Sequence, residues 1–548
     1  MTSDVQSSYT SGTSTTPLLG DTIGANLLRT VTKFPDREAL IDVPSGRRWT
    51  YTALNSDVDA LARGLLAVGV SKGDRVGIWA PNVPEWVLIQ YATAKIGAIL
   101  VNVNPSYRKH ELKYAVQQSG MRMIVALPQF RGSDYAAMIE QVSPECPGLT
   151  EVVYIGTASW ETLVKGGEAF PASAVEQAMA SLSADEPINI QYTSGTTGSP
   201  KGATLSHHNI LNNGYFVTET LNFTEQDRLC VPVPFYHCFG MVMCNLGATS
   251  HGAAIVIPAP SFDGAATLQA VQDERCTTLY GVPTMFIAEQ NLENFHSYDL
   301  SSLRTGIMAG SPCPVEVMKR CMSEMHMGAV SIAYGMTETS PVSMQTQPDD
   351  DVAHRTETVG RVHPHLEVKI VDPVTGLTVP RGEPGEFCTR GYSVMLGYWN
   401  DPEKTAAAID PARWMHTGDL AVMFTDGYVN IVGRIKDMVI RGGENLYPRE
   451  IEEFLYTHPD VADVQVIGVP DTKYGEELCA WILMKPGATP LDSAAVAQFC
   501  EGHLSRYKVP RYVLVVDEFP MTVTGKVRKM DMRATTMELL GLGLPETR

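Results

Sequence analysis

The 548-residue sequence has no run of 18 apolar residues, so we expect no integral membrane segment. Basic residues are also scarce: 42 Lys and Arg stand against 61 Asp and Glu, which leaves a formal net charge of -19. A surface of that sign repels phosphate backbones and disfavours nucleic-acid binding, although a nucleotide needs only a local group of donors. With 44% hydrophobic residues, the composition is globular and excludes a disordered or collagenous chain.

The ten cysteines form no C-x-x-C pair and no zinc-type spacing. We therefore expect reduced, mostly buried thiols and no disulfide framework. Targeting features are equally scarce, because the first basic residue is Arg29 and the early Ser- and Thr-rich residues contain no apolar core. We expect residues 1–20 to be a disordered leader and the protein to be cytoplasmic.

Short apolar strands alternate with helices over most of the chain. The first predicted strands are 75–80, 100–103 and 121–126, with helices over 84–97 and 107–119 between them. Further strands are expected at 188–192, 254–257, 277–280, 304–308 and 330–334. This alternation predicts parallel sheets covered by helices.

Two later regions have their own patterns. Between 359 and 433, β-runs and Gly/Pro turns predict a small β-barrel or antiparallel sheet. From about residue 437 strands and helices alternate again, and the roughly 110 remaining residues suffice for a separate domain.

Residues Tyr192 to Gly202 read YTSGTTGSPKG, between a predicted strand and a helix that Ser206 would cap. Small residues would let backbone N–H groups approach phosphate oxygens, and Lys201 would add positive charge. The stretch is not a Walker A loop, because Pro200 precedes the lysine and Gly202 follows it. A plain surface loop would explain the Gly, Ser and Thr but not the lysine, so we favour phosphate binding.

This loop and six further motifs resemble those of the adenylate-forming superfamily, which includes acyl-CoA synthetases, adenylation domains and firefly-type luciferases. The six motifs, in the family's order, are Pro234-Phe-Tyr-His237, Tyr334-Gly-Met-Thr-Glu-Thr339, Thr417-Gly-Asp419, Gly433-Arg-Ile-Lys-Asp437, Gly442-Gly-Glu-Asn445 and Thr524-Gly-Lys526. The resemblance covers roughly residues 25–535, nearly the whole chain.

The resemblance implies an α/β multi-domain fold. We expect an N-terminal adenylation domain over 21–433, built of two α/β subdomains and a small β-barrel. A hinge over 434–437, with Lys436 at its pivot, would connect it to a mobile, small α+β C-terminal domain over 438–548.

The reaction implied by the resemblance has two steps. A carboxylate attacks the α-phosphate of ATP and expels pyrophosphate, and the thiol of CoA then displaces AMP from the acyl adenylate. Two anions meet in the first step, so positive charge and Mg²⁺ are expected to offset their repulsion. The residues expected to take part in catalysis are Lys526, Thr337, Glu338 and His237, with Glu338 as the metal ligand.

The family's binding residues transfer motif by motif. ATP binding is expected at Thr193, Ser194, Gly195, Thr196, Thr197, Gly198, Lys201, Gly310, Ser311, Pro312, Tyr334, Gly335, Thr337, Asp419, Arg434 and Lys526. Among these, Asp419 would accept hydrogen bonds from the ribose hydroxyls. CoA is expected along Gly442, Gly443 and Glu444, and the acyl group near His237, Met241, Met285 and Phe286.

The acyl substrate is the least defined part of this prediction. Residues 236–246 carry no charge and are rich in methionine, which favours an apolar tail and a medium- or long-chain fatty acid, with aryl acids as an alternative. An enzyme that loads a carrier protein is disfavoured, because no carrier domain follows Lys526. A luciferase-type oxygenase shares the motifs, and a non-catalytic nucleotide-binding relative would have lost the charged motif residues that this chain retains.

Overall fold

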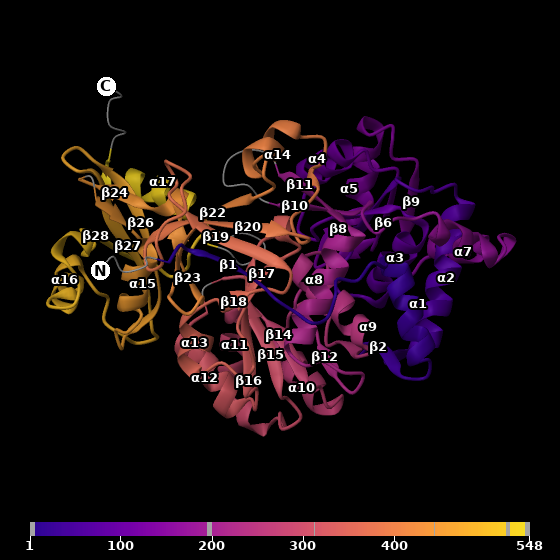
Figure 1. The fold of residues 1–548 in the computed structure, drawn as a ribbon, viewed down its shortest axis with the longest axis horizontal. Coiled ribbons are helices and arrows are strands. Elements are labelled where there is room, and N and C mark those ends of the chain that lie inside the picture. The colour runs from indigo at the N-terminus through magenta and orange to yellow at the C-terminus, as the bar shows by residue number, and fades with distance from the viewer. Residues whose placement is uncertain (1–5, 194–199, 312, 443, 522–526, 543–548) are drawn as a thin grey trace.

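Two large mixed sheets form the framework of the N-terminal region (Figure 1). The computed structural model describes residues 6–193, 200–311, 313–442, 444–521 and 527–542. The seven-stranded sheet has the order β21-β11-β10-β5-β4-β6-β9, and the nine-stranded sheet has the order β18-β17-β16-β15-β14-β12-β13-β2-β3. The predicted α/β fold is thereby confirmed.

The strands of the seven-stranded sheet are β4 (Arg75–Trp79), β5 (Ile99–Asn102), β6 (Met123–Ala126), β9 (Glu151–Tyr154), β10 (Pro187–Thr193), β11 (Lys201–Ser206) and β21 (Gly397–Tyr398). Those of the nine-stranded sheet are β2 (Glu38–Asp42), β3 (Arg47–Thr50), β12 (Arg228–Cys230), β13 (Ala254–Ile257), β14 (Thr278–Gly281), β15 (Thr305–Ala309), β16 (Ala329–Gly335), β17 (Val342–Gln345) and β18 (Arg361–Val362). In each sheet the strands that alternate with helices are parallel, and antiparallel strands are added at the edges.

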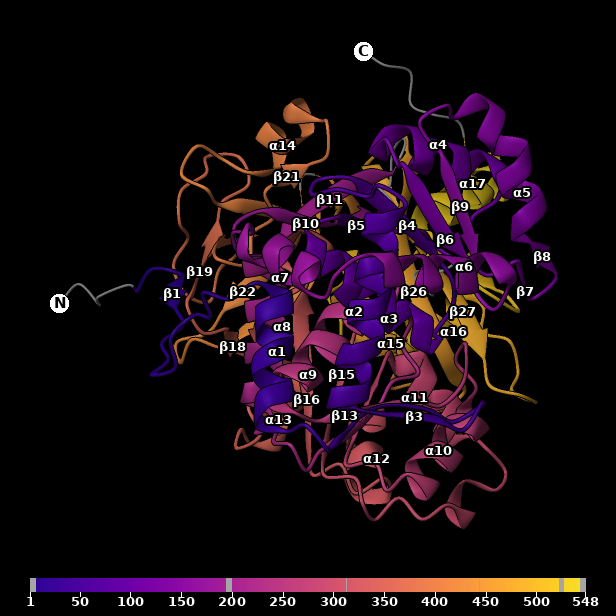
Figure 2. The ribbon, with the colours of Figure 1, turned by 90° about the vertical axis from the view of Figure 1, so that its right-hand side faces the viewer.

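The helices that cover these sheets are α1 (Ile23–Lys33), α2 (Tyr51–Ala67), α3 (Pro84–Ile96), α4 (Lys109–Ser119), α5 (Tyr135–Val142), α6 (Ala158–Gly166), α7 (Ser173–Ala180), α8 (His207–Thr220), α9 (Gly247–His251), α10 (Gly264–Asp273), α11 (Pro283–Gln290), α12 (Val315–Glu324), α13 (Val352–Glu357) and α14 (Pro402–Ala408). A π-helix, η3, spans Phe239–Leu246. In the view of Figure 2, α1, α2 and α3 lie together, and the three helices contact one another. None of the helices in the described segments has the length and apolarity that a bilayer crossing requires.

Helix α3 lies at the centre of the largest hydrophobic cluster. All of its residues are buried, which fits its nearly continuous apolar sequence, since a helix that is hydrophobic all round belongs inside a protein. Pro84 begins the helix and Gly97 ends it in the left-handed conformation, with φ of 72°. The same cluster includes Leu100 from one sheet and Ile307 from the other, so it joins the two sheets.

The region from 359 to 434 forms most of a five-stranded antiparallel sheet. Its order is β1 (Tyr9–Ser11), β19 (Leu366–Val371), β20 (Pro384–Gly391), β22 (Met415–Met423) and β23 (Val429–Arg434). Strand β1 corrects our expectation of a disordered leader over residues 1–20, of which residues 1–5 lie outside the described residues. Tyr9 pairs with Lys369, and Ser8 and Gly12 donate backbone hydrogen bonds to Val379 and Leu366. Backbone pairing needs no apolar side chains, which is why the polar composition misled the prediction.

The C-terminal part has its own sheet, at the gold end of the ribbon in Figure 1. Its strands are β24 (Val439–Arg441), β25 (Glu444–Leu446), β26 (Val461–Asp471), β27 (Gly475–Met484) and β28 (Tyr512–Val515), and its helices are α15 (Pro448–Leu455), α16 (Ser493–Cys500) and α17 (Lys529–Leu540). Two separate hydrophobic clusters fill it. Arg449 Nη1 donates to the Ile431 carbonyl at 2.7 Å, which connects this part to β23.

The segment after β10 also differs from our expectation. We predicted a strand, a loop and then a helix, but the chain forms the additional strand β11 before α8 begins. Strand β11 is antiparallel to β10 and to β21, so Lys201 starts a strand and does not face a helix N-terminus. Ser206 does cap α8 as predicted, because its hydroxyl accepts from the Asn209 N–H.

Deleting residues 1–12 is expected to lower the melting temperature, because the edge of β19 loses its partner strand. At a net contribution of about 0.5–1.5 kcal/mol each, the two hydrogen bonds that Ser8 and Gly12 donate alone predict a loss of about 1–3 kcal/mol in the free energy of unfolding. Differential scanning calorimetry would measure it. The control is a deletion of residues 1–5, which keeps Tyr9–Ser11 and their pairing with β19; equal melting temperatures for both deletions would contradict the prediction.

Candidate active site

The β10–β11 hairpin brings two predicted ATP-binding residues together. Thr193 ends β10 and pairs with Lys201 at the start of β11. The Lys201 ammonium lies 4.8 Å from the centre of the Tyr398 ring, a cation–π contact. Residues 194–198 of the predicted phosphate loop lie outside the described residues.

The motif Tyr334 to Thr339 lies at the end of strand β16. Strand β16 ends at Gly335, where a Cβ would lie 1.8 Å from the Pro341 carbonyl oxygen, so this turn requires glycine. The next residues form the short helix η5 (Thr337–Thr339). Buried Glu338 accepts hydrogen bonds at Oε1 from the Tyr398 hydroxyl at 2.9 Å and from Thr193 Oγ1 at 3.2 Å. The fold thus brings Glu338 to the hairpin from a different sheet.

Asp419 is held from two sides. Its Oδ2 accepts from the Tyr334 hydroxyl at 2.7 Å, and its Oδ1 lies 2.9 Å from Arg434 Nε. The Asp419 carboxylate raises the pKa of Arg434, while burial and then Asp419 raise the pKa of Tyr334. Three predicted ATP-binding residues therefore form one hydrogen-bonded group.

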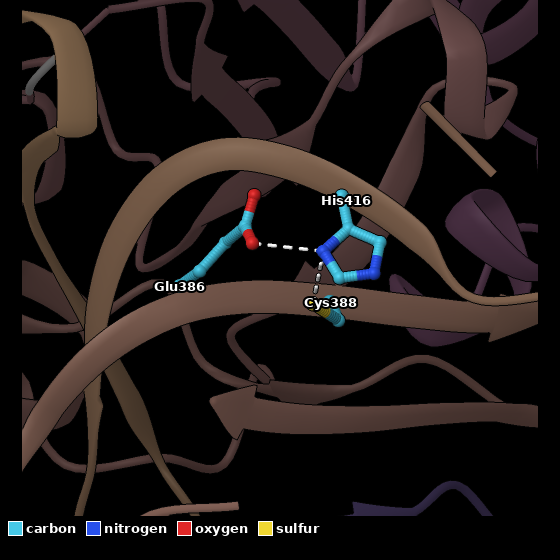
Figure 3. A group of neighbouring side chains, drawn as sticks. All are labelled: Glu386, Cys388 and His416. Carbon is cyan, nitrogen blue, oxygen red and sulfur yellow. Dashed lines mark hydrogen bonds and ion pairs between the residues drawn. The ribbon is translucent and has the colours of Figure 1, made fainter. Parts of the chain in front are cut away.

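A second group of side chains holds the turn before Asp419 (Figure 3). Glu386 Oε2 and Cys388 Sγ, both on β20, lie 2.8 and 3.5 Å from the same atom, His416 Nδ1 on β22. Glu386 Oε1 also accepts from the Gly418 N–H at 3.1 Å. In the described part of the chain, these three residues are the group whose Cys, His and carboxylate atoms all lie within 4.8 Å. The hydrogen bond to Glu386 raises the pKa of His416.

His237 lies two residues before the start of the π-helix η3. Its Nδ1 accepts from the Phe239 N–H at 3.2 Å, and Cys238 Sγ lies 3.6 Å from Thr337 Oγ1. The predicted acyl region and the Tyr334–Thr339 motif are therefore in contact. π-Helical turns are uncommon and often occur at functional sites.

The predicted acyl residues separate into two groups. Met241 is buried on η3 in the large cluster, and Met285 packs against that same cluster. Amide groups of Asn102 and Gln191 lie 3.2 and 3.1 Å from Met241 Sδ, so one side of this methionine is polar. Phe286 belongs to the other large cluster, where its ring lies against Gly281, so the structure does not bring it together with Met241.

The remaining predicted residues are dispersed. Gly310 follows β15 in a left-handed conformation, with φ of 93°, and Ser311 comes next. Lys436 lies in the short helix η6 (Ile435–Asp437), and Gly442, with φ of 61°, precedes Glu444 in the β24–β25 hairpin. Lys526, Gly443 and Pro312 lie outside the described residues, so their predicted roles stay predictions.

Sequence reasoning missed Tyr398, Glu386 and His416. None belongs to a motif that predicts chemistry by spacing alone. No sequence signal singles out Tyr398, because the pairing of Gly397-Tyr398 with residues that follow Lys201 is visible only in the structure. For His416, the signal is its place directly before Thr417-Gly-Asp419.

The charges at this site suit a phosphorylated ligand. Lys201 and Arg434 supply positive charge, while buried Glu338 offers the type of oxygen ligand that a hard divalent cation prefers. Asp419 offers acceptor atoms suited to hydroxyl groups. Together with the two α/β sheets and the separate C-terminal sheet, these features match what the resemblance to the adenylate-forming superfamily predicts.

Comparison with known families agrees. Residues 27–399 match the model of the AMP-binding enzyme family, and residues 450–526 match the AMP-binding enzyme C-terminal domain. The chain therefore belongs to the AMP-binding enzyme family, as an ATP-dependent acyl-CoA synthetase.

The sequence relatives cover nearly the whole chain. The Bacillus subtilis (strain 168) protein YngI, whose name assigns it provisionally as an acyl-CoA synthetase, is 48% identical over 96% of this chain and 99% of its own. The Danio rerio mitochondrial medium-chain acyl-CoA ligase ACSF2 is 44% identical over 98% of this chain and 91% of its own. Among solved structures, ATP-bound MatB from Rhodopseudomonas palustris is 29% identical, with a TM-score of 0.84 over 95% of this chain and 100% of its own.

Replacing Glu386 by Gln is expected to make the melting temperature depend on pH differently from the parent. Because Glu386 raises the pKa of His416, their ion pair stabilises the fold fully below about pH 6.5 and is lost as the pH rises through the raised pKa. The parent should therefore exceed Glu386→Gln in melting temperature at low pH, and the difference should shrink at higher pH. The amide oxygen introduced by Glu386→Gln can still accept from the Gly418 N–H, which limits other losses.

Scanning calorimetry between pH 5.5 and about pH 8.5 would test this, since His is the side chain that titrates there. The double variant Glu386→Gln/His416→Gln serves as a control, because it lacks the titrating partner. A melting-temperature difference that is constant with pH would contradict the assignment.

Proposed function

We propose that this enzyme activates a medium-chain fatty acid with ATP and transfers the acyl group to CoA. The observation that carries the proposal is the convergence of Thr193, Lys201 and Glu338 from different sheets at one site. The joined group of Tyr334, Asp419 and Arg434 supports a nucleotide as the ligand.

In this proposal each part of ATP meets a matching group. Asp419 accepts from the ribose hydroxyls, which an acceptor-only carboxylate can do beside its existing contacts. Lys201 and Arg434 offset the phosphate charge, and Thr337 donates to the α-phosphate. Gly335 has no side chain, which allows the close approach of the Pro341 carbonyl at this turn.

Glu338 fits the Mg²⁺ that such a reaction requires. Mg²⁺ is commonly bound by one or two carboxylates together with substrate phosphate oxygens, and Glu338 is a buried carboxylate beside the predicted phosphate loop. When bound, the ion would neutralise phosphate charge as the two anions meet.

The chemistry then proceeds in two displacements. A carboxylate oxygen of the acid bonds to the α-phosphorus while the bond to pyrophosphate breaks, and Lys526 stabilises the charge that develops there. The CoA thiolate then bonds to the acyl carbon while the bond to AMP breaks. The protein needs no nucleophile of its own, which agrees with nine buried cysteines and one half-buried cysteine.

Two observations support a medium-chain acid. The 44% identical relative from Danio rerio is named a medium-chain acyl-CoA ligase. The π-helix carrying Met241 is fully buried and apolar except for Asn245, yet the amides of Asn102 and Gln191 meet Met241 on one side. These amides also donate to the Tyr236 carbonyl and to Asn189 Oδ1, and a longer hydrocarbon tail would be costly to bury there because it would displace such partners from buried amides.

The C-terminal domain, from residue 438, would serve both half-reactions by moving about residues 434–437, with Lys436 at the pivot. It would bring Lys526 to the α-phosphate in the first step and Gly442, Gly443 and Glu444 to CoA in the second. Such a movement is a common solution when one site must run two reactions in turn. A cytoplasmic location stays a prediction.

A panel of acids tests the substrate. Purified protein with ATP, Mg²⁺ and CoA should convert straight-chain acids of intermediate length to acyl-CoA and AMP more efficiently than acetate, long-chain or aryl acids, measured by mass spectrometry. Reactions without CoA should yield acyl-AMP only. Acyl-AMP that ignores CoA would overturn the proposed acceptor, and an aryl preference would overturn the proposed acid.

Variants test the proposed roles. Glu338→Gln and Lys526→Ala should each lower kcat for acyl-AMP formation by about 10²–10³-fold, the size expected when one charge-stabilising group is removed. Supplied acyl-AMP should still be converted to acyl-CoA by Lys526→Ala. The exposed Lys319→Ala serves as a control and should keep parental rates; adenylation by Lys526→Ala at the parental rate would remove that lysine from the mechanism.

A further inference from the structure

Tyr398 contacts both the predicted metal ligand and the predicted phosphate lysine. Its hydroxyl donates to Glu338 Oε1 at 2.9 Å, and its ring lies beneath the Lys201 ammonium, 4.8 Å from the ring centre. No motif used in the functional prediction includes this tyrosine. It is buried, with 6% of its surface exposed.

We propose that Tyr398 is a positioning residue that fixes the Glu338 carboxylate for metal binding and holds Lys201 for the phosphates. This inference rests on the proposed function and deepens its account of the metal and phosphate groups. Tyr398 touches neither substrate nor metal in this role, because it acts through two other side chains.

The backbone around Tyr398 is fixed from both sides. Its N–H donates to Thr405 Oγ1 at 2.9 Å, and β21 pairs with β11, where Ala203 is the partner of Tyr398. The next residue, Trp399, donates its N–H to the Gly202 carbonyl at 2.7 Å. Tyr398 and Lys201 therefore lie on two paired strands, β21 and β11.

The Glu338 side is equally constrained. The Met395 N–H donates to the Glu338 carbonyl at 2.9 Å, so the loop before Tyr398 also holds the Glu338 backbone. Thr193 is the second donor to Oε1. Two hydroxyl donors on one carboxylate oxygen fix its orientation, and outer-shell donors of this kind are worth about 10–100-fold in metal affinity.

The chemistry of the phenol suits a donor. A tyrosine hydroxyl keeps its proton at neutral pH, because the ordinary pKa of a phenol is about 10. A protonated phenol can donate to the carboxylate without competing with it for a cation.

Tyr398→Phe separates the two contacts, because it removes the hydroxyl and keeps the ring under Lys201. We expect the Mg²⁺ concentration for half-maximal acyl-AMP formation to rise about 10–100-fold, while the KM for the acid stays unchanged. Tyr398→Leu removes the ring as well and should also raise the KM for ATP several-fold at saturating Mg²⁺.

The matched control is Tyr392→Phe. Tyr392 is also buried, and its ring lies 6.2 Å from the ring of His208 and 6.3 Å from that of Phe216, in a different hydrophobic cluster. This variant should keep the parental Mg²⁺ dependence. If the role of Tyr398 were purely structural, Tyr398→Phe would have a lower melting temperature or a lower kcat, but the same Mg²⁺ dependence as the parent.

A binding measurement gives a readout independent of turnover. Mn²⁺ titration followed by electron paramagnetic resonance, with an α,β-methylene analogue of ATP present, should show weaker binding for Tyr398→Phe and Glu338→Gln than for Tyr392→Phe and parent. Metal affinity of Tyr398→Phe within about twofold of parent would overturn the inference. If Glu338→Gln also binds Mn²⁺ like the parent, the proposed metal site itself is wrong. The Glu338 variant therefore distinguishes a failure of the metal site from a failure of the Tyr398 inference.

Discussion

The site depends on keeping two carboxylates in mostly buried surroundings. Removing a charge from water is costly unless partners replace the lost hydration. Glu338 accepts hydrogen bonds from the hydroxyls of Thr193 and Tyr398. Asp419 accepts from the Tyr334 hydroxyl and forms an ion pair with Arg434. These donors come from β10, β21, β16 and β23, so each carboxylate needs two sheets, and three of the sheets must be assembled before both carboxylates are satisfied. The requirement explains why a site of a few side chains needs so large a framework.

Much of the fold could be predicted from the sequence, because apolar periodicity is a local signal. The strand at 75–80 and the helix that Pro84 begins and Gly97 ends lie where predicted. Strand β11 could not be predicted in this way. Its residues are small, and its pairing with β21 joins positions almost two hundred residues apart, which no local pattern records.

The site was predictable in its motif residues but not in their supports. Motif spacing pointed to Glu338 and Asp419, and the structure does bring each one to other predicted residues. Tyr398 and Glu386 act by holding those residues, and a tyrosine or glutamate outside a motif is indistinguishable in sequence from a core or surface residue. Phe286 illustrates the converse, since an apolar residue in the right segment turned out to face a different cluster from Met241.

The pairing of β1 with β19 has a consequence for biosynthesis. Tyr9 is synthesised before its partner Lys369, which follows about 360 residues later. At a synthesis rate of about 5–20 residues per second, the first strand waits tens of seconds for its place in the sheet. The polar composition around it then has a use, because Thr10, Ser11 and the neighbouring Ser and Thr residues offer little apolar surface for aggregation during that interval.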